Sequence, residues 1–347
     1  MRDLKTIPVD KFIEEALYNK KTGYYFSKDP FGKDGDFITS PGISFLFSEM
    51  IAIWIIYFWE MIGKPKNFSF VELGPGDGRL CKTLLNTFEK FPQFKNSTKI
   101  YLYEKSEKLI KIQKKNLKGQ KISWIKNFKT LKNCPAIFFG NEFFDAIPIK
   151  QFKKKNNEIY EKYFKFKEKK FLKTVYKKVS SSMLQELGKY GILKFDGIFE
   201  YPKSGLKELA LVSKKIKSLG GGLLLVDYGF LGQNNVSTLQ SVKKHKKNMI
   251  FDNIGKADIT YLVNFDLLKN FLKIQNLNVN NVVSQSFFLK RVGIIKRAGI
   301  LSNKMSFKEK SDLYYRLQRL LDPKQMGQLF KVICAYKSKK KISLGFK

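Results

Sequence analysis

The chain has 347 residues and a formal net charge of +36, so it can form one large domain or two smaller ones. Such a charge favours nucleic acid or an anionic membrane as a partner. However, only six of the 66 basic residues are arginine, which phosphate clamps and base readers prefer, and lysine is spread over every segment. The charge therefore indicates a lysine-rich composition rather than specific nucleic-acid binding.

The three cysteines, Cys81, Cys134 and Cys334, lie far apart without C-x-x-C spacing, and His245 is the only histidine. These facts argue against a disulfide framework, a metal site and a Ser-His-Asp hydrolase. Residues 1–9 lack the apolar core of an export signal. The most apolar window, residues 50–59, has about half the length that a bilayer requires and predicts a buried helix. We expect a cytoplasmic protein without membrane insertion.

The first part of the core alternates between strand and helix patterns. Apolar runs predict strands at residues 67–74, 99–106, 121–125 and 135–142, and helical patterns cover residues 79–91, which Pro92 closes, and 107–117. This alternation predicts a parallel sheet with right-handed crossovers.

Beyond residue 152 the pattern changes to a lysine-rich alternation. Residues 159–179 predict a solvated antiparallel hairpin that turns near Lys169. Next come an amphipathic helix at 206–219, a glycine break at 220–222 and a strand at 223–229. We expect a charged loop at 243–247 and a turn with a helix at 258–272. Late strands are expected at 282–293 and 329–336, with a helix at 308–321 between them.

The glycine loop in residues 70–80, FVELGPGDGRL, follows the first predicted core strand. Gly74, Gly76 and Gly78 permit backbone angles and close approaches that a Cβ forbids. The spacing fits neither G-x-G-x-x-G nor a Walker loop, and the acids Glu72 and Asp77 repel a pyrophosphate. A cationic ligand fits better, and S-adenosylmethionine carries both an ammonium and a sulfonium. The alternative is a tight strand-to-helix connection that binds no ligand.

The next predicted strand ends at Glu104. A carboxylate at this place can accept hydrogen bonds from both hydroxyls of a ribose, because it follows the glycine loop by one strand-helix unit. The alternative is a solvated acid that stabilises the start of the helix at Glu107.

Several motifs resemble the MidA family of methyltransferases. They are GYYF (residues 23–26), GDFITSPGIS (35–44), VELGPGDG (71–78) and NEFFDAIPIKQF (141–152), and the resemblance continues through LLLVDYG, ADITYLVNF and MGQLFKVI. It covers nearly the whole chain, and NEFFDA with GDFITSP is more diagnostic than the glycine loop. Two positions depart from the family pattern: Asp77, where arginine is more common, and Gly42, where glutamate is. The glycines are intact, so cofactor binding should survive.

The resemblance implies an α/β fold, a seven-stranded class I (Rossmann-like) methyltransferase sheet with an N-terminal helical segment and inserted elements. We expect a helical segment and a cofactor-covering loop at 1–65. The sheet core should comprise 66–152 and 206–347, with an inserted segment near 232–275. Residues 153–205 form an inserted hairpin and helix region for substrate or other interactions.

The motif NEFFDA supplies the candidate catalytic residues at the end of a predicted strand. Methyl transfer depends mostly on alignment and electrostatics, and carboxylates can hold a guanidinium acceptor and receive its proton. We expect Glu142 to bind the acceptor, with Asp145 as the second carboxylate of the pair. Asp145 alternatively caps the following turn. If the segment becomes helical, Asn141 and Asp145 share a face.

Further cofactor contacts are implied around the sheet. Asn141 reaches the cofactor side through its amide. Asp36, Phe37 and Thr39 are expected to close over the cofactor, or else form an ordinary turn. Asn127 and Phe128 occupy the region where adenine often lies.

The family's mitochondrial members methylate an arginine of a respiratory complex I subunit. The implied function is therefore arginine methylation of a subunit of NADH-quinone oxidoreductase by a bacterial relative, with a protein partner and no specific nucleic acid. A homodimer is left open. The alternatives are a non-catalytic, cofactor-binding assembly factor and, with less support, a nucleic-acid methyltransferase, for which no N-P-P-Y motif is present.

Overall fold

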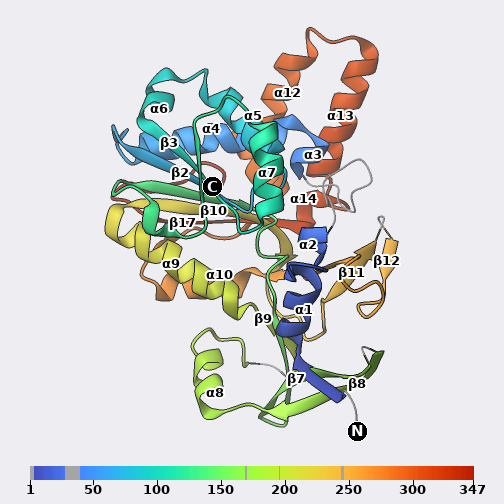
Figure 1. Cartoon of the computed structure of the whole chain (residues 1–347). Coiled ribbons are helices and arrows are strands. Elements are labelled where there is room, and N and C mark those ends of the chain that lie inside the picture. The colour runs from blue at the N-terminus through green and yellow to red at the C-terminus, as the bar shows by residue number, and fades with distance from the viewer. Residues whose placement is uncertain (1–3, 28–39, 169, 195, 244–245) are drawn as a thin grey trace. The chain divides into compact units, whose positions relative to one another are not determined.

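The computed structural model describes residues 4–27, 40–168, 170–194, 196–243 and 246–347 (Figure 1). The chain forms two compact units. Unit 1 comprises Met1–Phe37, Phe144–Leu209 and Phe230–Phe271, and unit 2 comprises Ile38–Phe143, Ala210–Gly229 and Leu272–Lys347. The domain boundaries expected from the sequence stay a prediction.

The central element of unit 2 is a mixed sheet. Its main path runs β15 (Asn278–Val279), β17 (Phe330–Lys337), β10 (Gly221–Phe230), β5 (Ala136–Asn141), β2 (Phe68–Leu73), β3 (Thr98–Tyr103) and β4 (Ile122–Ile125). The strands from β10 to β4 are mutually parallel, and β17 is antiparallel to β10. Nine strands belong to this sheet within the described residues, so the expected number of seven holds only for the main path.

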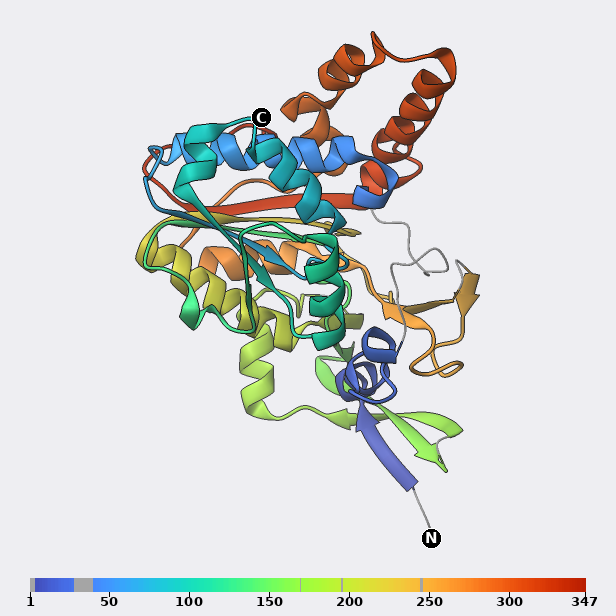
Figure 2. The same cartoon turned by 45° about the horizontal axis from the view of Figure 1, so that its top comes forward.

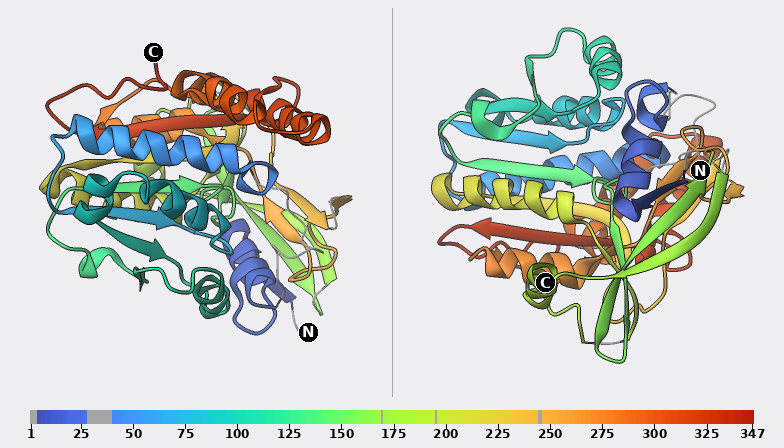
Figure 3. Two further views of the ribbon diagram at one scale, coloured as in Figure 1. Left: turned by 90° about the horizontal axis from the view of Figure 1, so that it is seen from above. Right: turned by 60° about the horizontal axis from the view of Figure 1, so that its bottom comes forward.

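The helices of unit 2 either cover the two faces of this sheet or pack on helices that do. They are α3 (Ser40–Ile43), α4 (Phe45–Met61), α5 (Arg79–Phe88), α6 (Pro92–Ser97), α7 (Glu107–Asn116), η1 (Phe128–Thr130), α11 (Gln285–Val292), α12 (Ile294–Ser302), α13 (Phe307–Leu321) and α14 (Met326–Leu329). The last residues of α9 (Lys203–Leu219) also belong to unit 2. Figure 2 shows α4 in light blue and α9 in yellow on opposite faces of the sheet, and Figure 3 (left) shows α4 lying across it.

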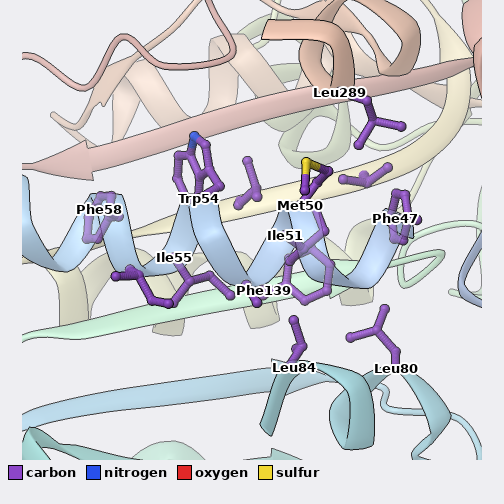
Figure 4. Close-up of a cluster of buried hydrophobic side chains, with 14 of the residues drawn as sticks. Phe47, Met50, Ile51, Trp54, Ile55, Phe58, Leu80, Leu84, Phe139 and Leu289 are labelled. Atoms are coloured by element: carbon purple, nitrogen blue, oxygen red, sulfur yellow. The ribbon is translucent and has the colours of Figure 1, made fainter. Parts of the chain in front are cut away.

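Helix α4 forms the centre of the largest apolar cluster (Figure 4). Its side chains are apolar nearly all round, and Phe47, Trp54 and Phe58 are fully buried. They pack with Leu84 of α5 and Phe139 of β5 in the same cluster. A helix that is hydrophobic on all sides must be buried, which confirms the prediction for residues 50–59.

Alternation along the strands decides which side chains join this cluster. In β2, Phe68 and Phe70 belong to the α4 cluster, whereas Val71 and Leu73 are buried outside it. Successive strand residues point to opposite faces, so Glu72 lies on the same face as Phe70. The carboxyl group of Glu72 is therefore directed to the side of the sheet that α4 and α5 cover.

The structure corrects three details of the predicted elements. Residues 282–293 form the two-residue strand β16 (Val283–Ser284) followed by α11, because the Ser284 hydroxyl accepts a hydrogen bond from the Phe287 amide and starts a helix. The helix predicted at 79–91 forms as α5 but ends at Phe88, three residues early, and Pro92 begins α6. Residues 258–272 contain most of the predicted helix, as α10 (Phe265–Ile274), but the strands β13 (Asp258–Thr260) and β14 (Val263–Asn264) stand where a turn was expected before it.

Unit 1 contains a five-stranded sheet of β1 (Leu4–Pro8), β6 (Lys150–Lys155), β7 (Glu158–Lys167), β8 (Lys170–Lys178) and β9 (Gly197–Tyr201). Strands β7 and β8, light green in Figure 3 (right), are antiparallel, which confirms the predicted hairpin. The unit's helices are α1 (Val9–Tyr18), α2 (Tyr24–Ser27) and α8 (Ser181–Gly188). Phe12 of α1 packs on Phe164 and Phe166, with ring centroids 5.2 Å and 5.9 Å apart.

Of the residues expected in a charged loop, 243, 246 and 247 belong to strands of a second sheet in unit 1, and 244–245 lie outside the described residues. Strand β11 (Gln240–Lys243) pairs with β12 (Lys246–Asn248) and with β13, both antiparallel. His245 lies outside the described residues. No helix among the described residues has both the length and the apolar character needed to cross a bilayer.

The stability of the fold is expected to depend on the two glycines at the start of β10. A Cβ on Gly221 would lie 1.9 Å from the carbonyl oxygen of Ala136, whereas a Cβ on Gly220 would meet nothing closer than 4.0 Å. Both glycines have positive φ angles. We expect Gly220→Ala to lower the free energy of unfolding by about 1–2 kcal/mol from backbone strain. Gly221→Ala should lose more than about 4 kcal/mol, because the β5–β10 pairing must also separate.

Urea denaturation of the two variants compares the same substitution at adjacent glycines. Equal losses for Gly220→Ala and Gly221→Ala would contradict the close β5–β10 approach described here.

Candidate active site

The candidate site lies where the strand order of the unit 2 sheet reverses. The chain runs outward from β2 through β3 to β4, and then returns to β5 on the other side of β2. In open α/β sheets, ligands bind outside the carboxyl ends of the strands at such a reversal. The glycine loop leaves β2 and the Asn141–Glu142 segment leaves β5 at this edge, where β2 and β5 are paired in register.

The glycine loop has a shape that only glycine adopts without strain. Gly74, Gly76 and Gly78 have φ angles of 64°, 57° and 85°, which lie in the left-handed region. Neighbouring side chains add a second constraint, since a Cβ on Gly74 would lie 3.1 Å from the Phe143 ring and a Cβ on Gly78 3.1 Å from Leu117. The loop therefore presents bare backbone at the reversal point.

Asp77 has a local partner at the start of α5. Its carboxylate accepts a hydrogen bond from the Arg79 amide at 3.1 Å and forms an ion pair with the Arg79 guanidinium. The charge of Asp77 is thus partly offset at the start of α5, and its part in attracting a cationic ligand stays a prediction.

Glu72 is the other acidic residue of the motif and lies in β2, just before the glycine loop. Its side chain is only 3% exposed, and burial raises its pKa to about 8, a shift that a hydrogen bond with Cys81 opposes and the charge of Asp77 increases. Its Oε2 atom is buried and has no hydrogen-bond partner among the described residues. A buried carboxyl with an unsatisfied oxygen fits a cationic ligand group, which would stabilise its ionised form.

Glu104 stands at the end of β3, also buried. Its Oε1 atom accepts a hydrogen bond from the Ser106 amide at 2.7 Å, and Oε2 accepts one from Gln113 Nε2 at 3.3 Å. Burial raises the pKa of Glu104, and these hydrogen bonds oppose the rise. Glu104 is therefore not the solvated acid of the alternative reading, although its bond to Ser106, the residue that caps α7, places it at the start of that helix.

Gln113 of α7 is a site residue that the sequence reasoning missed. Its side chain is fully buried and also donates to the Gly76 carbonyl oxygen at 2.8 Å. Asn116 adds a second link from α7 to the loop, with its Nδ2 2.9 Å from the Asp77 carbonyl oxygen. A signal was available, since Gln113 is a polar residue on the same stripe as Leu109 and Ile110, the buried face of an amphipathic helix.

Asn141 is the last residue of β5, and Glu142 follows it in a strained conformation. Glu142 has φ 50°, which is unusual for a residue with a side chain. Its backbone N–H donates to the Val226 carbonyl oxygen at 2.9 Å, and the Asn141 Nδ2 donates to Glu142 Oε1 at 2.9 Å. The Oδ1 atom of Asn141 is buried without a hydrogen-bond partner among the described residues. Strain of this kind is concentrated at functional sites.

Asp145 belongs to unit 1, so its pairing with Glu142 stays a prediction. It is 6% exposed. The pKa of the half-buried Tyr25 is raised first by desolvation of its hydroxyl, and then by electrostatic interaction with Asp258, Tyr18 and Asp145. No helix forms at residues 142–149, and Ile147 N–H instead closes a turn onto the Phe144 carbonyl oxygen. The helical arrangement considered for Asn141 and Asp145 is therefore wrong.

Asn127 and Phe128, two of the remaining predicted cofactor residues, make local contacts. Asn127 is exposed and caps η1 through the Lys129 amide at 3.0 Å, while Phe128 packs on Tyr103 and Phe138. Their contact with adenine stays a prediction. Asp36, Phe37 and Thr39 lie outside the described residues. Among the described residues, no group of three or more potential ligands could hold a metal ion.

The raised pKa of Glu72 predicts a pH-dependent stability. Between pH 5 and 8 the unfolded chain ionises this carboxyl while the native protein keeps it protonated, so native stability falls as the pH rises. We expect Glu72→Gln to become steadily more stable relative to the wild type over this range, by thermal melts of the ligand-free protein. The exposed Glu89→Gln is the control, and a parallel pH profile for wild type and Glu72→Gln would contradict the buried, protonated carboxyl.

Comparison with known proteins gives the family. Residues 50–283 match a family described as "Putative S-adenosyl-L-methionine-dependent methyltransferase". The Xenopus laevis protein named "Protein arginine methyltransferase NDUFAF7, mitochondrial" is 30% identical over 352 residues, covering 94% of this chain and 80% of the relative. The human protein of that name is also 30% identical, over 93% of this chain and 78% of its own length.

Solved structures support the fold. A Burkholderia thailandensis protein bound to S-adenosyl-homocysteine superposes with a TM-score of 0.79 at 22% identity, covering 99% of this chain and 89% of that one. A native structure from the same organism gives 0.81 at 21% identity, covering 98% and 89%. The predicted Rossmann-like fold and the predicted cofactor class are confirmed. The chain therefore belongs to the MidA and NDUFAF7 family of S-adenosylmethionine-dependent methyltransferases.

Proposed function

We propose that the protein methylates an arginine side chain of a protein substrate, and that this substrate is a subunit of respiratory complex I. The arginine specificity is supported by the relatives, which are named protein arginine methyltransferases. The observation that carries the proposal is Glu142, a carboxylate held in a left-handed backbone conformation at the strand-order reversal, beside the glycine loop.

The residues of unit 2 are proposed to hold the cofactor as follows. The buried carboxyl of Glu72 faces its cationic methionine part, the bare backbone of Gly74, Gly76 and Gly78 approaches it closely, and Glu104 accepts from its ribose. Asn127 and Phe128 are the proposed adenine contacts, and Asp36, Phe37 and Thr39 the proposed cover. When bound, S-adenosylmethionine supplies an electrophilic methyl group on a sulfonium.

Glu142 is proposed to bind and orient the acceptor. A carboxylate pairs with a guanidinium through charge-assisted hydrogen bonds, which concentrate the positive charge on the bound nitrogens and leave a third nitrogen more nucleophilic. The Asn141 amide fixes Oε1 of Glu142, so the orientation of the carboxylate plane is set before the substrate binds. Glu142 then receives the proton released on methyl transfer, with Asp145 as the second proposed carboxylate.

Identification of the modified residue tests this function. The protein is incubated with cofactor labelled in the methyl group and with the proteome of its host, and the label is located by mass spectrometry. We expect labelled arginine on a complex I subunit. Label on RNA or DNA would overturn the function, and tight cofactor binding without any transfer would favour the non-catalytic assembly factor.

The role of Glu142 has its own test. We expect Glu142→Gln to lower the transfer rate by about 100-fold or more, because the amide can neither hold the guanidinium as an ion pair nor accept its proton. Cofactor affinity, measured by calorimetry, should change little. A variant that keeps the wild-type rate, or that loses rate only through cofactor binding, would rule out the acceptor role.

The backbone contact of the loop is tested at Gly76. We expect Gly76→Val to weaken cofactor binding at least about 10-fold, since the new side chain stands where backbone meets ligand. The control is Gly119→Val, which creates the same left-handed strain at φ 85° with nothing within 4 Å of the Cβ. If both variants lose affinity equally, or neither does, the cofactor does not contact this loop.

A further inference from the structure

We propose that Gln113 is a positioning residue for the cofactor ribose: it holds the glycine loop and the Glu104 carboxylate at a fixed spacing. This inference rests on the ribose role proposed above for Glu104. It adds a residue of α7 that has no place in the reaction itself.

The hydrogen bonds determine how the side-chain amide of Gln113 is oriented. The Trp124 indole N–H can only donate, so the atom facing it at 2.9 Å must be Oε1 of Gln113. Both hydrogens of Nε2 are then directed at acceptors, the Gly76 carbonyl oxygen at 2.8 Å and Glu104 Oε2 at 3.3 Å. One side chain thus joins the loop after β2, the end of β3 and strand β4.

Packing alone does not explain a glutamine at this position. Gln113 is fully buried on the apolar stripe of α7, where leucine or methionine would fill the space without desolvating an amide. A buried amide costs free energy unless it is hydrogen-bonded, and a matched apolar group is often at least as stable. We therefore explain the glutamine at position 113 by the two groups that its amide holds in place, the Gly76 carbonyl and the Glu104 carboxylate.

Gln113 orients one of the two oxygens of the Glu104 carboxylate. The Ser106 amide holds Oε1 at 2.7 Å, while the longer contact of 3.3 Å from Gln113 aligns Oε2 without saturating it. A ribose hydroxyl can therefore donate to Oε2, which keeps further lone-pair capacity. The same amide draws the Gly76 carbonyl towards α7, so the loop and the carboxylate cannot shift independently.

The test compares two ligands, S-adenosylhomocysteine and its analogue without the two ribose hydroxyls, by calorimetry. The wild type should prefer the complete ligand. Gln113→Met should weaken S-adenosylhomocysteine binding by about 10- to 100-fold, the range of a hydrogen bond to a charged group, and weaken the analogue less than about 3-fold. A merely structural role would lower both affinities equally, and that result, or no change at all, would overturn the proposal.

Two further variants make the result decisive. Asn116→Ala removes the other link between α7 and the loop without a bond to Glu104, and should affect both ligands by the same small factor. Gln113→Glu keeps the shape if Gln113→Met fails to fold. Its new carboxylate would repel Glu104 at neutral pH, so the preference for the complete ligand should be lost at pH 7.5 and partly return near pH 5.5, relative to the wild type at each pH. A pH-independent preference would contradict the role.

The outcomes also separate this inference from the site on which it rests. If the wild type binds both ligands equally, Glu104 does not bind the ribose hydroxyls. Both the ribose role of Glu104 and the positioning role of Gln113 then fail. If the wild type discriminates but Gln113→Met retains the discrimination, only the positioning role fails.

Discussion

The burial of α4 against the central sheet is the constraint on which the site depends. This helix is apolar nearly all round, so one face of the sheet must supply apolar partners along its whole length. The alternation of β2 follows from that demand, and it places Glu72 on the covered face two residues after Phe70. A buried carboxyl next to the glycine loop is thus a consequence of how the core is filled.

The few arginines of this lysine-rich chain show where guanidinium geometry is needed. Arg297 of α12 binds Glu49 of α4 through two hydrogen bonds, at 2.8 and 3.0 Å, and Arg316 of α13 reaches the Ile43 carbonyl oxygen at 3.2 Å. Lysine carries the same charge but lacks the planar fork that makes such two-point contacts. The C-terminal helices are therefore fastened to the α4 region by residues that the composition would otherwise disfavour.

Much of the fold could be predicted from the sequence because the core strands are continuous apolar runs. Strands β2, β3 and β5 and helix α7 lie where the periodicity placed them. The pattern failed at residues 282–293, where an apolar run resembled a strand although Ser284 provides a helix cap and Phe288 and Leu289 form a buried helical face. Short apolar runs do not distinguish the two structures by period alone.

The site was predictable in its residue types but not in its geometry. The glycine spacing predicted a loop that exposes its backbone. The ion pair of Asp77 with Arg79 was not predicted, because it depends on how two side chains that are two residues apart are placed. The motif NEFF does not predict the left-handed backbone of Glu142, because glutamate rarely adopts this conformation. The bonds of Gln113 join the loop after β2, Glu104 after β3 and Trp124 of β4, so only the folded structure reveals them.

The protonated state of Glu72 has a consequence for how the cofactor and the solvent are linked. With a pKa of about 8, the carboxyl carries a proton in most molecules at neutral pH. A cation held beside it, as proposed here, favours the carboxylate and expels that proton. Loading of the enzyme would then be coupled to proton release, so that acidification of the surroundings lowers its occupancy by the methyl donor without any change in the donor's concentration.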